Sequence, residues 1–275
     1  MQDRTGRRGI RGDFLRVREI TDEKHLFIYE DELATKARAT IRDYTLRILP
    51  VTDENQKLVG IISRGTVMTI SSSVSPIRVK GIMTNPNYAA ILEGDAFSAV
   101  KEMIRQDELC APVVESTQDK TYRGVLGLER FMEAMLKTSP EKLSKTTGEI
   151  MSKNVVTCSP EDEIDSIWRL MQTESLTGLP VVRKDKLVGI VTQKDLLERG
   201  ALLPTFESKK GRFRTSTKIS SIMETQVIAV KPHIKAIRVA KVMISKDIGR
   251  VPVVDEEGRL VGIVDREDVV RLLAK

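Results

Sequence analysis

The sequence contains few of the side chains on which enzymes and metal proteins depend. It has two histidines and two cysteines among 275 residues. Cys110 and Cys158 have no second cysteine or histidine at metal-ligand spacing, so we expect two reduced, buried thiols and no metal site. His25 and His233 lie in unrelated places, no nucleophile has a recognisable base beside it, and no glycine-rich phosphate-binding motif occurs. These absences argue against an enzyme.

Long hydrophobic runs are also absent. The apolar stretches have the length of strands, far below the roughly 18 residues that a membrane-spanning helix requires. The basic segment from Met1 to Arg16 is not followed by an apolar core of the kind found in signal peptides. With 40% hydrophobic and 31% charged residues, the composition is that of a globular protein. We therefore expect a cytoplasmic protein without membrane contact.

The sequence does contain one pattern that occurs four times. Each copy has a proline followed by valine and, some residues later, a glycine followed by two aliphatic residues. The prolines are Pro50, Pro112, Pro180 and Pro252, and the glycines are Gly60, Gly124, Gly189 and Gly262. Successive prolines lie 62, 68 and 72 residues apart. A unit of about 65 residues can enclose a small core but is marginally stable alone, so we expect the units to pair.

The last copy predicts the order of elements within a unit. It begins with an apolar strand, which is followed by a helical segment that starts at Pro232. Two further apolar runs, separated by a turn, and a short final helix come next. The strand is 227–230, the helix reaches Met243, the two runs are 251–254 and 260–264, the turn is 255–258, and the last helix is 266–275. The predicted unit is β-α-β-β-α.

The third copy supports this order. Ser159 followed by Pro160 and two carboxylates is typical of a helix start. A buried helical face then follows at helical spacing, formed by Ile164, Ile167, Trp168 and Met171. We expect the helix to begin at Pro160.

The order of elements, the apolar-Pro-Val-Val hairpin and the ending Gly-aliphatic-aliphatic-Thr-x-x-Asp resemble the CBS (cystathionine beta-synthase) domain family over roughly residues 14–275. The resemblance implies an α/β (α+β) fold of four units in two pairs, known as Bateman modules, which pack as a flat disc. It also implies clefts that bind adenosine-containing ligands, as in four-unit members similar to the gamma subunit of AMP-activated kinase. The expected units are 14–76, 77–137, 144–203 and 218–275, with a basic disordered tail at 1–13 and a basic loop at 204–217.

Thr192 and Asp195 lie where a strand is expected to end and a helix to begin, and free backbone N–H groups attract anions there. The resemblance implies that the threonine contacts a phosphate and that the aspartate accepts both hydroxyls of a ribose. Adenine would then lie against aliphatic side chains, and backbone groups near the prolines would read its edge. The aliphatic residues implied are Ile190 and Ile263, and the prolines are Pro180 and Pro252. A Thr-x-x-Asp sequence is also a capping box that needs no ligand.

The fourth copy retains Asp268 as the expected ribose ligand but has Asp265 in place of the hydroxyl. Asp265 would repel a phosphate or cap the helix. The resemblance assigns phosphate contacts to Arg250 and Arg47, which would supply the missing positive charge. The first two copies end in residues 63–66 and 127–130 and lack the carboxylate. We therefore expect ligands in the second pair, and a structural role or a different ligand for the first pair.

The net charge is +6 and the sequence pI about 9.2. Much of the excess lies in two clusters, Arg4, Arg7, Arg8, Arg11 and Arg16 near the start, and Lys209, Lys210, Arg212, Arg214 and Lys218 later on. These are either solvated segments, counter-charge for phosphates, or nucleic-acid contacts, although the first cluster has no interleaved aromatic residues for base stacking.

The leading hypothesis is a non-catalytic sensor of AMP, ADP or ATP that regulates an unidentified protein. The alternatives are a sensor of S-adenosylmethionine or methylthioadenosine, and a nucleic-acid-associated protein. A homodimer is compatible with each of them.

Overall fold

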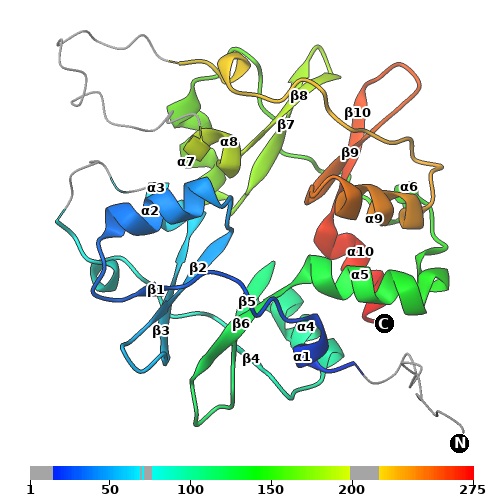
Figure 1. Cartoon of the computed structure of the whole chain (residues 1–275). Helices are drawn as coiled ribbons and strands as arrows, with labels where there is room; N and C mark the ends of the chain where they lie inside the picture. Colours follow the sequence, from blue (N-terminus) through cyan, green and yellow to red (C-terminus); the bar gives the residue numbers. More distant parts are fainter. Residues whose placement is uncertain (1–14, 69, 71–75, 199–216) are drawn as a thin grey trace, which may run out of the picture.

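The computed structural model describes residues 15–68, 70, 76–198 and 217–275. The expected basic tail, and all but the last residue of the expected basic loop, lie outside these residues. The described chain forms four units around a common centre (Figure 1), which are numbered 1 to 4 in chain order. Units 1 and 2 are called the first pair, and units 3 and 4 the second pair.

Units 1 and 2 have the predicted β-α-β-β-α order. Unit 1 consists of β1 (Ile28–Tyr29), α2 (Ala34–Asp43), β2 (Ile48–Thr52), β3 (Leu58–Ser63) and α3 (Arg64–Met68). Unit 2 consists of β4 (Ala90–Ile91), α4 (Ala96–Arg105), β5 (Cys110–Val114), β6 (Tyr122–Gly127) and α5 (Leu128–Thr138). In each unit the short first strand is parallel to the second, and the second and third form an antiparallel hairpin.

Units 3 and 4 repeat this arrangement, but their first strand is reduced to one parallel bridge, Cys158 with Val181 and Val230 with Val253. Unit 3 consists of α7 (Ile164–Thr173), β7 (Gly178–Arg183), β8 (Lys186–Thr192) and α8 (Gln193–Glu198). Unit 4 consists of α9 (Ala236–Ser245), β9 (Arg250–Val254), β10 (Leu260–Asp265) and α10 (Arg266–Leu273). The hairpin turn predicted at 255–258 is confirmed, because the Asp255 N–H donates to Arg259 O at 3.0 Å.

A short leading segment precedes each unit and crosses onto the other unit of its pair. These segments contain α1 (Val17–Ile20), η1 (Val79–Gly81), α6 (Thr147–Ile150) and η4 (Ile219–Ser221), and η2 (Pro140–Leu143) joins the two pairs. The exchange is reciprocal. Asp22 bridges Val125 of unit 2 while Thr84 bridges Ile61 of unit 1. In the second pair, Ser152 bridges Ile263 and Glu224 bridges Ile190.

This exchange explains the four repeated glycines. Sulfur atoms of the leading segments lie against three of them: a Cβ at Gly60 or Gly189 would be 2.8 Å from Sδ of Met83 or Met223, and Met151 covers Gly262 in the same way. At Gly124, where φ is +139°, a Cβ would lie 2.5 Å from the Asp22 carbonyl oxygen. Each glycine therefore allows the partner's segment to approach the strand.

Two of the predicted helix starts are wrong, and hydrogen bonds from the leading segments explain why. The helices begin at Ile164 and Ala236, four residues after Pro160 and Pro232. The carbonyl of Pro160 accepts from Ser220 N–H at 2.9 Å, and that of Pro232 accepts from Gly148 N–H at 2.8 Å. Because these carbonyls bond to another segment, they are not used for helical hydrogen bonds.

The helices form two cores, each shared between the pairs. One core joins units 2 and 4 and the other joins units 1 and 3. In Figure 1, α5 lies beside α10 near the centre, and α8 contacts α2 and α3. The predicted face of α7 is buried in the second core. Cys110 and Cys158 are free and buried, as predicted, and burial raises the pKa of each thiol to about 12.

The described helices include none that is both long enough and apolar enough to cross a bilayer.

We predict that Gly124→Ala lowers the free energy of unfolding by about 2–3 kcal/mol, because the added Cβ meets backbone at a positive φ. Gly258→Ala is the matched control, since φ is +80° there and nothing lies within 4 Å of the added Cβ. It should cost only about 1 kcal/mol of backbone strain. Urea unfolding measures both variants, and equal losses would contradict the proposed role of Gly124.

Candidate ligand clefts

The predicted Thr192 and Asp195 lie together where β8 meets α8. The Thr192 N–H and hydroxyl donate to Oδ2 of Asp195 at 2.8 and 2.6 Å, and the Asp195 N–H lies 3.3 Å from the Thr192 hydroxyl. The two residues therefore form a capping box, which is the alternative to ligand binding that the sequence also allowed. Both side chains are half-buried. Among the described residues, no hydrogen bond to Oδ1 of Asp195 is found.

Asp265 and Asp268 form the corresponding turn in unit 4. The Asp265 N–H donates to Oδ2 of Asp268 at 2.8 Å, which is the half of a capping box that the third helical residue supplies. Burial raises the pKa of Asp268 to about 6, and the neighbouring charges of Asp265 and Glu267 act in the same direction. The carboxylate expected to bind ribose is thus held in a poorly hydrated position.

Arg250 connects units 3 and 4. Its guanidinium donates to the Gly178 carbonyl and to the Thr177 hydroxyl of unit 3, and its Nε lies 3.4 Å from Oδ1 of Asp265. Burial lowers the pKa of Arg250, although Asp265 opposes this shift. The predicted phosphate contact is therefore paired with the carboxylate that stands in place of the usual hydroxyl.

Arginines from units 1 and 4 gather at the centre of the molecule. Burial lowers the pKa of Arg64 to about 10 and also lowers the pKa of Arg266, and the charge of Arg47 contributes to both shifts and to that of Arg250. Sequence analysis identified Arg250 and Arg47 but missed the other two. Their equivalent positions could have indicated them, because Arg64 and Arg266 are each the first residue of the last helix of their unit.

The remaining predicted residues lie on the strands. The backbone of Ile190 pairs with Glu224, and that of Ile263 pairs with Ser152. The carbonyls of Pro180 and Pro252 accept from Cys158 N–H at 3.1 Å and from Val230 N–H at 3.0 Å. These two carbonyls thus already bond to the start of their own units.

The faces between paired sheets differ between the two pairs. In the first pair this face is a buried cluster, and the Phe27 ring covers Tyr122 at a centroid distance of 5.5 Å. The cluster consists of Ile48, Leu58, Cys110, Val114, Tyr122 and Val125. Most residues at matching hairpin positions in the second pair are only partly buried, namely Val182, Leu187, Ile190, Val254 and Leu260, whereas Ile263 is buried. Val156 and Ile228, just before the parallel bridges of units 3 and 4, are 40% and 36% exposed, and Leu26 and Phe27 at the matching place in unit 1 are each 37% exposed. The hairpin positions, and not these flanking residues, therefore make the apolar face of the second pair the more open one.

The first pair also lacks the carboxylate at the motif positions. In unit 1 the Ser63 and Thr66 hydroxyls bond to each other at 3.0 Å. In unit 2 Gly127 replaces the hydroxyl, and Glu129 points to Arg266 of unit 4.

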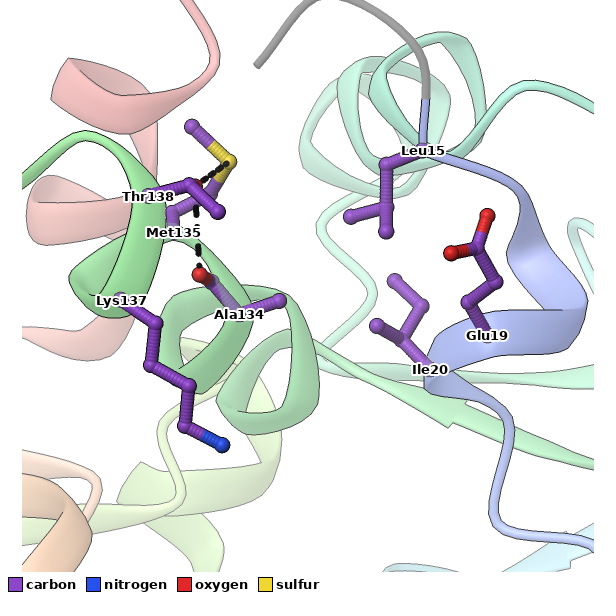
Figure 2. A pocket seen from close by; sticks show the side chains of 7 residues that line it. All are labelled: Leu15, Glu19, Ile20, Ala134, Met135, Lys137 and Thr138. Atoms are coloured by element: carbon purple, nitrogen blue, oxygen red, sulfur yellow. Dashed lines mark hydrogen bonds between the residues drawn. The ribbon is translucent and has the colours of Figure 1, made fainter. Parts of the chain in front are cut away.

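A separate pocket of about 210 Å³ lies between α1 and α5 (Figure 2) and contains none of the predicted site residues. Leu15, Glu19 and Ile20 form one side, and Ala134, Met135, Lys137 and Thr138 form the other.

Comparison with known proteins identifies the repeated unit. The model of the CBS domain family matches residues 17–73, 148–201 and 219–275. MJ1225, an uncharacterized protein of Methanocaldococcus jannaschii, is 27% identical over 95% of this chain and 100% of its own length. Its crystal structure, described as that of a proposed archaeal homologue of γ-AMPK, superposes with a TM-score of 0.82 over 94% of this chain and 99% of that chain, at 24% identity.

Two shorter CBS-pair structures also align with 46% of this chain and 94% of their own. CBSX2 of Arabidopsis thaliana in complex with AMP is 28% identical with a TM-score of 0.40. The CBS pair of MJ0100 in complex with 5′-methylthioadenosine and S-adenosyl-L-methionine is 32% identical with a TM-score of 0.39.

The raised pKa of Asp268 predicts a pH dependence of stability without ligand. A carboxyl whose pKa is higher in the folded than in the unfolded protein destabilises the fold as it ionises, between about pH 4 and pH 6. Asp268→Asn should therefore gain about 1–3 kcal/mol of unfolding free energy relative to the parent when the pH rises from 4 to 7. Urea unfolding at both values measures this difference. Asp165→Asn, which removes an exposed carboxylate of α7, is the control, and the same gain there would contradict the assignment.

Proposed function

The chain belongs to the CBS domain family, and on this premise we propose that it is a non-catalytic regulatory protein whose second pair of units binds an adenine nucleotide. In this proposal the Asp195 and Asp268 carboxylates accept hydrogen bonds from ribose hydroxyls. The adenine lies against the aliphatic side chains between the sheets, including Ile190 and Ile263. Occupancy of the clefts then changes how the chain contacts a regulated protein.

The openness of the second pair is the observation that carries this proposal. Its apolar face is partly exposed beside two turns that each carry an aspartate. The equivalent face of the first pair is buried by its own side chains, Phe27 and Tyr122 among them, and has no such aspartate. The flat faces of adenine gain from burial against such aliphatic surface, which is otherwise exposed to water, while its polar edge needs hydrogen-bond partners.

The central charge favours a ligand that carries phosphate. Four buried or half-buried arginines lie there. Among the described residues, Asp265 pairs with Arg250, and Glu129 and the exposed Asp247 pair with Arg266. The lowered arginine pKa values show that burial of these charges opposes their ionised form. A phosphate that reached the arginines would relieve this cost through charge-assisted hydrogen bonds. AMP, ADP and ATP all meet this requirement.

A second candidate is favoured by one observation. Asp265 stands where a phosphate-contacting hydroxyl is expected and is paired with Arg250 at 3.4 Å. This carboxylate would repel a phosphate in the unit 4 cleft but would accept a neutral or cationic adenosine compound. Methylthioadenosine and S-adenosylmethionine are of this kind. The nucleic-acid hypothesis depends on clusters that lie almost wholly outside the described residues.

The position of the motif helices suggests how occupancy is transmitted. α8 contacts α2 and α3 of unit 1, and α10 contacts α4 and α5 of unit 2. A ligand held at the start of α8 or α10 therefore acts on helices that pack against the first pair. Such a ligand shifts the balance between two arrangements only by binding them unequally.

We predict that Asp195→Ala combined with Asp268→Ala lowers AMP affinity at least about tenfold, because a hydrogen-bonded carboxylate contributes about 1.5–3 kcal/mol. Isothermal titration of the full chain with AMP, ADP, ATP, methylthioadenosine and S-adenosylmethionine measures the loss and ranks the ligands. Asp95→Ala is the matched control, since Asp95 caps α4 in the first pair by accepting from Ser98 N–H at 2.7 Å. Affinities within twofold of the parent for every ligand would contradict the proposed clefts.

A further inference from the structure

An ion pair between a buried arginine and a half-buried glutamate joins the two pairs of units at their centre. Arg266, the first residue of α10, is 1% exposed, and its Nη1 donates to Oε2 of Glu129 at 2.9 Å. Glu129 is the second residue of α5, so the contact connects unit 4 with unit 2. The guanidinium also donates to the Ile248 carbonyl at 3.3 Å, and its Nη2 lies 3.7 Å from Asp247 Oδ1. Asp247 is well exposed, which leaves Glu129 as the principal counter-charge.

The sequence around Glu129 is adapted to this contact. The Glu129 side chain folds over Gly127, where a Cβ would overlap its carboxylate. The other units have Ser63, Thr192 and Asp265 at this position. Unit 2 therefore has a glycine, Gly127, at the position that the Glu129 side chain covers. A side chain at this position would require the Glu129 carboxylate to move from its place beside Arg266.

Arg266 fixes the turn that carries the unit 4 aspartates. It lies between Asp265 and Asp268, and its own N–H donates to the Gly249 carbonyl at 2.8 Å. Its side chain anchors the same turn to Ile248 and to Glu129. Removing Glu129 would leave a buried guanidinium without its main partner, which is costly enough to displace the arginine.

We propose that Glu129 is a positioning residue for ligand binding in unit 4. Through Arg266 it holds the first turn of α10, and with it Asp268, in the orientation that a ribose requires. The first pair, although it lacks the ligand motif, thereby sets the affinity of the unit 4 cleft. By thermodynamic linkage, a ligand in that cleft also strengthens the contact between units 4 and 2. This inference rests on the proposed function of the second pair.

Unit 3 supplies an internal control for this inference. Gln193 occupies the position of Arg266, and its side chain donates to the Leu176 carbonyl of its own unit at 3.0 Å. The corresponding hydrogen bond in unit 4 runs from the Arg266 side chain to the Ile248 carbonyl. Gln193, however, is uncharged and needs no acidic partner. The unit 3 cleft should therefore not depend on Glu129.

The test compares Glu129→Gln in two backgrounds of the full chain. Asp195→Ala leaves the unit 4 cleft to be titrated, and Asp268→Ala leaves the unit 3 cleft. With AMP as the probe in calorimetry, Glu129→Gln should weaken binding in unit 4 about fivefold to tenfold and change unit 3 less than twofold. Glu133→Gln is the matched control, because Glu133 lies on the same helix and pairs with Arg130 at 3.7 Å. Equal losses in both clefts, or no loss in unit 4, would overturn the inference.

A measurement without ligand separates this inference from the proposed function. Hydrogen exchange of the amides of residues 266–269 should become faster in Glu129→Gln, while that of residues 193–196 stays unchanged. Unchanged protection of the first group contradicts the positioning role whether or not AMP binds. Failure of the parent chain to bind any adenosine compound contradicts the proposed function instead.

A second variant covers the case in which Glu129→Gln does not fold. Arg266→Gln introduces the residue that unit 3 has at this position, and the double variant with Glu129→Gln leaves no buried charge. The double variant should weaken AMP binding in unit 4 no more than Arg266→Gln alone, because both changes remove the same contact. A clearly greater loss in the double variant than in Arg266→Gln alone would show that Glu129 acts independently of Arg266 and would refute the proposal.

Discussion

The reciprocal exchange of leading segments between paired units is the constraint on which the rest of the structure depends. Each segment pairs with a strand of the other unit, at a point where glycine permits close approach. A single unit of this size buries too little apolar surface to be stable alone. The exchange joins two units into one body, and the helices left on the outside of each body then pack against those of the other pair. Repetition of one weak unit thus produces a structure with shared cores.

The two pairs share this scaffold but differ in what fills the space between their sheets. In the first pair, buried side chains such as Tyr122 occupy it. In the second pair, most of the matching residues remain partly exposed beside Asp195 and Asp268. The same hairpin therefore serves as a structural core in one pair and as a candidate cleft in the other. Such a division explains why the first pair can lose the motif carboxylates without loss of the fold.

Much of the fold could be predicted from the sequence because its signals are local. The proline, glycine and hairpin turn recur in all four units, and the buried face of α7 follows from helical spacing. The starts of α7 and α9 could not be predicted in this way, because hydrogen bonds from distant leading segments take the carbonyls of Pro160 and Pro232. Contacts between units have no local signal.

The same distinction holds for the candidate site. The turns of Thr192 with Asp195 and of Asp265 with Asp268 form within four residues, and the sequence predicted both, including their capping alternative. The difference between the open and the closed face could not be predicted, since it depends on how two sheets pack. The pairing of Arg266 with Glu129 spans 137 positions of the chain, and only the three-dimensional arrangement brings it to the ligand motif.

A crystal structure of the full chain grown with AMP tests the central claim most directly. The account predicts electron density for the nucleotide between the sheets of the second pair, with ribose hydroxyls within hydrogen-bond distance of Asp195 or Asp268 and the phosphate toward the central arginines. Density for AMP in the first pair, or aspartates bonded only to their own backbone beside empty clefts in the second, would contradict it.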